Sequence, residues 1–142
     1  MRTLITILLF IFSLACTGQK WKPEVLPLSL IYVSGASKGT ADYLQFHYSG
    51  NNQFLNPDLS WRNKWKNGDP AQGEAFPGSS TIFVSFTDGW HLCNTVNKYT
   101  CIAAIVIRIN HKQPAIHYLY DFLAFTMAYS AGFWTTYELI LK

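Results

Sequence analysis

The chain has 142 residues, which suits one domain with a single core. Only 13% of its residues are charged, whereas an ordinary soluble domain is about 25% charged. Because so little charge is available to cover a soluble fold, the composition favours contact with a membrane. The net charge of +3 suits an anionic lipid surface and is too small to indicate nucleic acid binding.

The N-terminus carries an early arginine, Arg2, followed by an apolar run over 4–15. This run is shorter than the ~20 residues that cross a bilayer and matches the apolar region of a signal peptide. We therefore expect a signal peptide at 1–18 and one helical domain over 19–142, placed in the inner membrane or envelope of a bacterium. The fate of the signal stays open between cleavage, retention as an anchor and lipidation at Cys16.

The first helix of the domain is expected over 28–48, where apolar and small residues recur at helical spacing. Within it, Gly35 and Gly39 have the Gly-x-x-x-Gly spacing that lets a second helix approach closely. The sequence therefore predicts a tightly packed helix pair at this point.

A polar loop is expected over 49–78, with one short helix at 56–68. Asn56 is suited to cap this helix and Pro57 to open it. Two tryptophans four residues apart would share one face of the helix, with basic residues around the rest. Such a helix could lie among lipid headgroups, or its rings could cap a soluble core. The residues expected at the membrane interface are Trp61, Arg62, Lys64, Trp65 and Lys66.

The stretch 79–109 begins with an apolar run of membrane character and continues through a second apolar segment. Gly89 favours a break in the chain near Asp88. Cys93 and Cys101 would lie roughly 12 Å apart on one continuous helix, too far for a disulfide. A disulfide therefore requires a turn within 94–100, and two packed free thiols are the alternative.

The last helix is expected over 114–141, opened by Pro114. Its central part, 122–137, contains no charged residue, and with its flanks it reaches the length of a transmembrane helix. Ala128 and Gly132 lie in a small-residue patch suited to close helix packing. The fold class expected is therefore all-α: a small membrane-associated bundle of three or four helices with one polar, tryptophan-bearing loop.

Two acid–imidazole pairs are the candidates for chemistry, one at i, i+3 spacing and one at i, i+4. If their helices run antiparallel, the four groups could converge and bind a divalent transition metal such as zinc, iron or manganese. Alternatively, each pair is a satisfied polar contact between helices, or lies at the membrane edge in contact with water. The candidate ligands are Asp88, His91, His117 and Asp121, with His47 and Glu138 as accessory groups.

Three segments resemble a family of small hypothetical bacterial proteins: GTADYLQFHYS at 39–49, NPDLSWRNKWKNGDPAQGEAFPGSST at 56–81 and TDGWHL at 87–92. These proteins share motifs of the form SWxNKW-KNGDPxxGxxFPxS and TDGWHL, and the resemblance extends over about 34–141. It implies a helical, membrane-associated build and no particular mechanism.

The function expected is that of a non-enzymatic membrane or envelope component in which buried Asp/His pairs set the helix packing. A small membrane metalloprotein and an exported soluble binding module are the alternatives. The chain has no nucleophile elbow and no glycine-rich phosphate loop after a strand, so an enzyme is the less favoured class. The expected partners are the lipid bilayer and, besides it, a second copy or a membrane protein.

Overall fold

The computed structural model describes residues 24–141, and within them every regular element is helical, which confirms the all-α prediction. The predicted signal peptide at 1–18 and Cys16 lie outside these residues. The main helices are α2 (Val25–Phe46), the short α3 (Pro57–Ser60), α4 (Gly89–Ile109) and α5 (Ala115–Trp134), which continues as the π-helical η5 (Thr135–Leu141).

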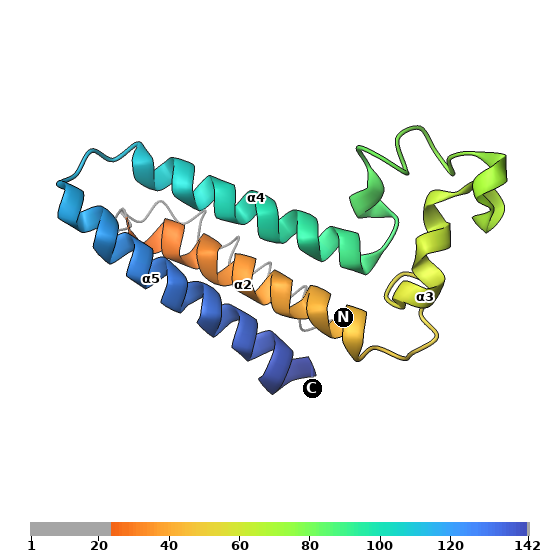
Figure 1. The fold of residues 1–142 in the computed structure, drawn as a ribbon, viewed down its shortest axis with the longest axis horizontal. Helices are drawn as coiled ribbons and strands as arrows, with labels where there is room; N and C mark the ends of the chain where they lie inside the picture. The colour runs from red at the N-terminus through yellow and green to blue at the C-terminus, as the bar shows by residue number, and fades with distance from the viewer. Residues whose placement is uncertain (1–23, 142) are drawn as a thin grey trace, which may run out of the picture.

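Helices α4, α2 and α5 lie side by side in one layer, with α2 in the middle (Figure 1). α2 packs against both neighbours, whereas α4 and α5 make few direct contacts with each other. α4 and α5 run in opposite directions and are joined by the turn at 110–114 (Figure 1). Because a single layer buries only one side of its outer helices, α4 and α5 keep broad faces uncovered by the described residues.

The contact between α2 and α5 is made by glycines. A Cβ atom added to Gly35 would lie 2.0 Å from the carbonyl oxygen of Tyr129, and one added to Gly132 would lie 2.1 Å from that of Tyr32. No side chain fits there without moving a backbone. The close packing predicted for both small-residue patches is therefore confirmed.

The contact between α2 and α4 is polar at its centre. Ser34 on α2 is fully buried, and its hydroxyl donates toward Asn97 on α4, 2.7 Å from the side-chain oxygen and 2.9 Å from the carbonyl oxygen. Ala104, one of the buried apolar side chains of α4, is small. The interior of the layer thus contains small and polar groups beside the larger Ile31 and Leu44.

The polar loop contains the predicted cap but not the predicted helix. Asn56 accepts a hydrogen bond from the Asp58 N–H at 2.9 Å, as expected of a cap. The α-helix ends at Ser60, followed by separate 3-10 turns over Trp61–Lys64 and Lys66–Gly68. Between these turns Trp65 is extended and bridges to Glu74, so the two tryptophans do not share a helical face. The amphipathic helix predicted at 56–68 is wrong.

The apolar run predicted at 79–86 is not a helix of membrane character. It consists of turns with a short 3-10 segment, Val84–Phe86, and the long helix begins only at Gly89. α4 is then continuous through 94–100, which keeps Cys93 and Cys101 apart as free thiols. The disulfide alternative is therefore wrong.

The predicted transmembrane helix is also wrong. Within residues 24–141, none of the helices combines the length and the apolar character that crossing a bilayer demands. α5 extends over 20 residues and includes His117, Asp121 and several tyrosines, which lower its hydropathy. Beyond Trp134 the chain continues as η5.

Candidate functional site

Asp88 and His91 form a pair at the start of α4. The Asp88 carboxylate, which is buried, accepts the His91 backbone N–H at 2.8 Å and lies 2.6 Å from His91 Nδ1. The Thr87 hydroxyl donates to the same carboxylate at 3.1 Å. Asp88 is thus the N-cap of α4, and its second oxygen holds the imidazole. This arrangement is a satisfied polar pair, although it lies within one helix end and not between two helices.

The thiol nearest this pair is poorly suited to nucleophilic chemistry. Burial, together with the charge of Asp88, raises the pKa of Cys93 to about 11. At neutral pH the sulfur is therefore a protonated, weakly reactive thiol.

Asp121, which was expected to pair with His117, bonds instead to Arg108 across the α4–α5 turn. The Nε of Arg108 donates to Asp121 Oδ2 at 2.7 Å, and the Gln113 amide donates to the same oxygen at 2.5 Å. Within residues 24–141 no hydrogen bond joins His117 to Asp121, and the His117 ring lies instead 6.2 Å from that of Tyr120. The predicted His117–Asp121 pair is therefore replaced by a pair between helices.

The charges of this ion pair stabilise each other. Partial burial opposes ionisation of Asp121, but the hydrogen bonds from Arg108 and Gln113 outweigh burial and lower the pKa of the carboxyl. The hydrogen bond with Asp121 in turn raises the pKa of Arg108, whose side chain is buried. Glu24, at the start of α2, adds a longer ion pair to Arg108 Nη1 at 3.7 Å.

The four predicted ligands do not converge. Asp88 and His91 lie at the first turn of α4, and His117 and Asp121 near the first turns of α5. Because the two helices are antiparallel, their first turns are at opposite ends of the layer (Figure 1), roughly 30 Å apart for helices of this length. Within residues 24–141 no group of three or more His, Cys, Asp or Glu side chains could hold a metal ion.

The remaining predicted site residues are dispersed. The ring nitrogen Nε2 of His47, at the end of α2, lies 2.7 Å from the Tyr137 hydroxyl, and Glu138 lies on η5. In the loop, Trp61 is exposed and the Arg62 guanidinium lies 5.2 Å from its ring centre. Lys64, Trp65 and Lys66 follow in the 3-10 and extended segments.

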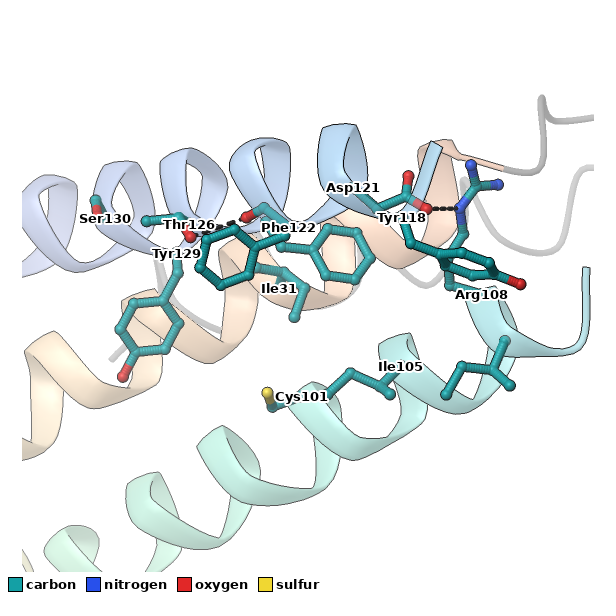
Figure 2. Close-up of a pocket in the computed structure, with 12 residues that line it drawn as sticks. Ile31, Cys101, Ile105, Arg108, Tyr118, Asp121, Phe122, Thr126, Tyr129 and Ser130 are labelled. Carbon is teal, nitrogen blue, oxygen red and sulfur yellow. Dashed lines mark hydrogen bonds and ion pairs between the residues drawn. The ribbon is translucent and has the colours of Figure 1, made fainter. Parts of the chain in front are cut away.

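A groove lies between α4 and α5 (Figure 2). It has a volume of about 460 Å³, within the range of about 300–1,000 Å³ typical of ligand pockets. Arg108 and Asp121 close one end, and Ile31 of α2 contributes to its floor. Its other walls are mainly apolar: Cys101, Ile105, Ile109, Tyr118, Phe122, Phe125, Thr126, Tyr129 and Ser130.

Outside the groove, α5 presents a further apolar surface. Its large side chains follow one another at spacings of four, three, four and seven residues, so they lie on one side of the helix. This side faces away from α2. We call this surface the lateral face of α5; its large members are Ile116, Tyr120, Leu123, Met127 and Trp134, each more than half exposed.

The sequence contains a signal for the Arg108–Asp121 pair. The spacing of residues within one helix does not reveal it, because the two residues lie on different helices. Arg108 is the one charged residue in the apolar segment 99–109, and Asp121 is the one Asp, Glu, Lys or Arg in 115–137. Two isolated opposite charges on either side of a turn are expected to meet when the helices fold back. The groove depends on which faces pack, and no local pattern indicates it.

A scan against protein-family models and searches of curated proteins and of solved structures gave no significant match.

Proposed function

We propose that this protein is a non-enzymatic envelope component that lies in the interfacial region of an anionic bilayer. In this arrangement the helices lie along the membrane surface, with the lateral face of α5 in contact with lipid. The proposal keeps a lipid partner for the chain and does not require any helix to cross the membrane.

The observation that carries the proposal is the distribution of side chains by size. Within residues 24–141 the buried hydrophobic side chains are Ile31, Ala41, Leu44 and Ala104, beside glycines and buried polar groups such as Ser34. Few large side chains inside and many large apolar side chains outside are typical of helices packed in lipid, where burial of large side chains does not drive association. In water, an exposed apolar surface of this extent requires a partner.

The lateral face of α5 suits lipid better than water in composition as well. No Asp, Glu, Lys or Arg lies between Ala115 and Trp134 except Asp121, which is bound to Arg108. Trp134 and Tyr120 are side chains favoured at headgroup depth. At the start of α5, the exposed Lys112 would add about 1 kcal/mol of attraction to an anionic leaflet.

The energy available is sufficient for reversible binding. Each of the five side chains is about half exposed, so immersing it would contribute roughly 1 kcal/mol, and the five together about 5 kcal/mol. This is comparable to the membrane affinity of one myristoyl chain. We therefore expect reversible attachment by this face alone.

Flotation of the full chain with vesicles of phosphatidylglycerol and phosphatidylcholine tests the proposal. Leu123→Lys, on the lateral face, should weaken vesicle binding about tenfold or more, because it removes apolar burial and places a charge in the interface. Leu59→Lys on α3 is the matched control, since Leu59 is also exposed but lies in the loop region.

Three results would overturn the proposal: wild-type chain that does not float, Leu123→Lys that floats like wild type, or a lipid-free dimer. The last is the competing explanation, because the spacing along the lateral face also suits a helix of a second copy. Sedimentation of the same sample without lipid distinguishes a dimer from a monomer.

A further inference from the structure

The side of α4 that points away from α2 carries large apolar side chains. Asn97 and Ala104 face α2, since Asn97 accepts the Ser34 hydrogen bond and Ala104, two helical turns further along, is buried. The apolar side chains lie two and five residues to either side of Ala104, which places them on the opposite side of the helix. We call this strip the outer seam of α4; its members, each about half exposed or more, are Tyr99, Ile102, Val106 and Ile109.

The outer seam of α4 and the lateral face of α5 lie at opposite edges of the layer. α2 packs between the two helices (Figure 1), and each surface is on the side of its helix away from α2. Because packed helices are about 8–10 Å apart, the axes of α4 and α5 are separated by roughly 20 Å. When the lateral face of α5 contacts a bilayer, the outer seam therefore points away from that bilayer and into water, where an apolar strip favours a partner.

The spacing of the outer seam is the same in both chain directions. Its members follow one another at intervals of three, four and three residues, which is symmetrical about Ala104 and matches the spacing of paired helices. A second α4 laid antiparallel on this strip would place Tyr99 opposite Ile109 and Ile102 opposite Val106. The seam is thus self-complementary, as a pair with twofold symmetry requires.

The charges of α4 permit the antiparallel pair. Between Gly89 and Asn110 the charged residues are Lys98 and Arg108, and Arg108 is bound to Asp121. In an antiparallel pair centred on Ala104, the two copies of Lys98 would be roughly 18 Å apart along the axis. This exceeds the Debye length of about 8–10 Å, so their repulsion is screened. A parallel pair would instead bring the two Lys98 side chains together.

The contact is too small to join two copies in solution. The four side chains expose roughly 400 Å² on each copy, about half of the ~800 Å² that each partner contributes to a standard interface. Many such contacts act together, however, when several copies are held on each of two facing membranes. We therefore expect pairing between membranes, and a monomer in solution.

We propose that the outer seam of α4 pairs antiparallel with the same seam of a second copy on a facing membrane, so that the protein bridges two bilayers. The inference rests on the proposed function, because attachment through the lateral face of α5 directs the seam away from the first bilayer. It goes further in naming a partner, the second copy, and an activity, the tethering of membranes.

Energy transfer between two labelled populations of vesicles of phosphatidylglycerol and phosphatidylcholine tests the bridging. The full chain is coupled to maleimide lipid through Met127→Cys, with Cys16, Cys93 and Cys101 replaced by serine, so that the lateral face of α5 is fixed to its vesicle. Transfer should rise when both populations carry protein. Ile102→Lys in both should reduce the rise at least fivefold, whereas Leu59→Lys, at an exposed loop position, is the matched control and should bridge fully.

A charge exchange tests the antiparallel register and guards against a loss of folding. Ile102→Glu on both populations should abolish bridging, and Ile102→Glu facing Val106→Lys should restore it, because these positions are opposite each other. Ile102→Glu facing Ile102→Lys, which a parallel pair would match, should not be restored.

Four results would overturn the inference: no bridging by the coupled chain, equal bridging by Ile102→Lys, restoration by the parallel match, or bridging to vesicles that carry no protein. The last would make lipid the partner of the seam. Flotation of the uncoupled chain separates the two proposals: a chain that floats and does not bridge contradicts only the pairing, whereas failure to float contradicts the proposed function.

Discussion

The Nε of Arg108 on α4 lies 2.7 Å from Oδ2 of Asp121 on α5, and within residues 24–141 this is the ion pair that joins the two helices. It spans the α4–α5 turn, where the two helices otherwise make few contacts. The pair therefore fixes the distance between the walls of the groove at one end.

Removing one partner of this pair should destabilise the fold. Asp121→Ala leaves the buried Arg108 guanidinium without its carboxylate, which we expect to cost about 2–4 kcal/mol in the free energy of unfolding. Urea unfolding followed by circular dichroism measures the change. The control is Asp42→Ala, which removes the more exposed Lys38–Asp42 pair on α2 and should cost about 0.5 kcal/mol or less. Equal losses in the two variants would contradict an anchoring role for Arg108–Asp121.

The same pair should make stability depend on acid pH. The pKa of Asp121 is lowered from its ordinary value of 3.8, so the unfolded chain binds the proton more readily than the folded one. The stabilisation is present above the unfolded pKa and is lost as the pH falls through the folded pKa.

Stability curves of wild type and Asp121→Asn between pH 7 and about pH 2 test this dependence. Asp69 and Glu74 also have lowered pKa values, through hydrogen bonds from the Ala71 N–H and the Ser80 hydroxyl respectively, and they act in the same direction in both proteins. The difference between the curves isolates Asp121 and should shrink on acidification. A constant difference would show that the carboxylate charge does not contribute.

The glycine contact between α2 and α5 predicts that a glycine-to-alanine replacement destabilises the protein, which is opposite to the usual effect in a helix. Replacing an interior helix glycine by alanine ordinarily stabilises a helix by about 1 kcal/mol. Gly35→Ala should instead destabilise the protein by about 2 kcal/mol or more, because the added methyl would lie 2.0 Å from the Tyr129 carbonyl oxygen. Thermal unfolding measures the sign. Ser29→Ala, at an exposed position on the same helix, is the control and should change little.

The cap of α4 should contribute more than an exposed cap. Asp88→Ala removes the acceptor of the His91 N–H and the partner of its imidazole, at a cost of about 2 kcal/mol. Asp69→Ala removes the equivalent acceptor for Ala71 at the exposed 3-10 turn Pro70–Gln72 and should cost clearly less. A larger loss in Asp69→Ala would contradict the assignment of Asp88 as a structural cap.

Local sequence signals located the long helices α2 and α5 and the cap at Asn56. The small-residue patches around Gly35 and Gly132 indicated close packing, and this prediction is confirmed because a glycine contact depends only on helical spacing. The cap at Asn56 was likewise predictable, since it depends on three neighbouring residues. The helix expected over 56–68 fails because Asn67 adopts a positive φ of 52° and Trp65 is extended, so the loop folds on tertiary contacts that spacing does not encode.

The candidate site was less predictable than the fold. Pairing His117 with Asp121 followed from their i, i+4 spacing, but Arg108 competes for the carboxylate with a permanent charge and a directed N–H. Convergence of the two acid–imidazole pairs failed for a topological reason. Consecutive antiparallel helices place their first turns at opposite ends, and Asp88 and Asp121 both lie near first turns.

The most direct test of the central claim is the environment of a probe on the lateral face of α5. An environment-sensitive fluorophore on Met127→Cys, with Cys16, Cys93 and Cys101 replaced by serine, should shift to the blue and be quenched by brominated lipid when anionic vesicles are added. The same label on Lys66→Cys, in the loop, should change little. An unshifted, unquenched signal at 127 in a chain that remains monomeric would contradict lipid contact at this face.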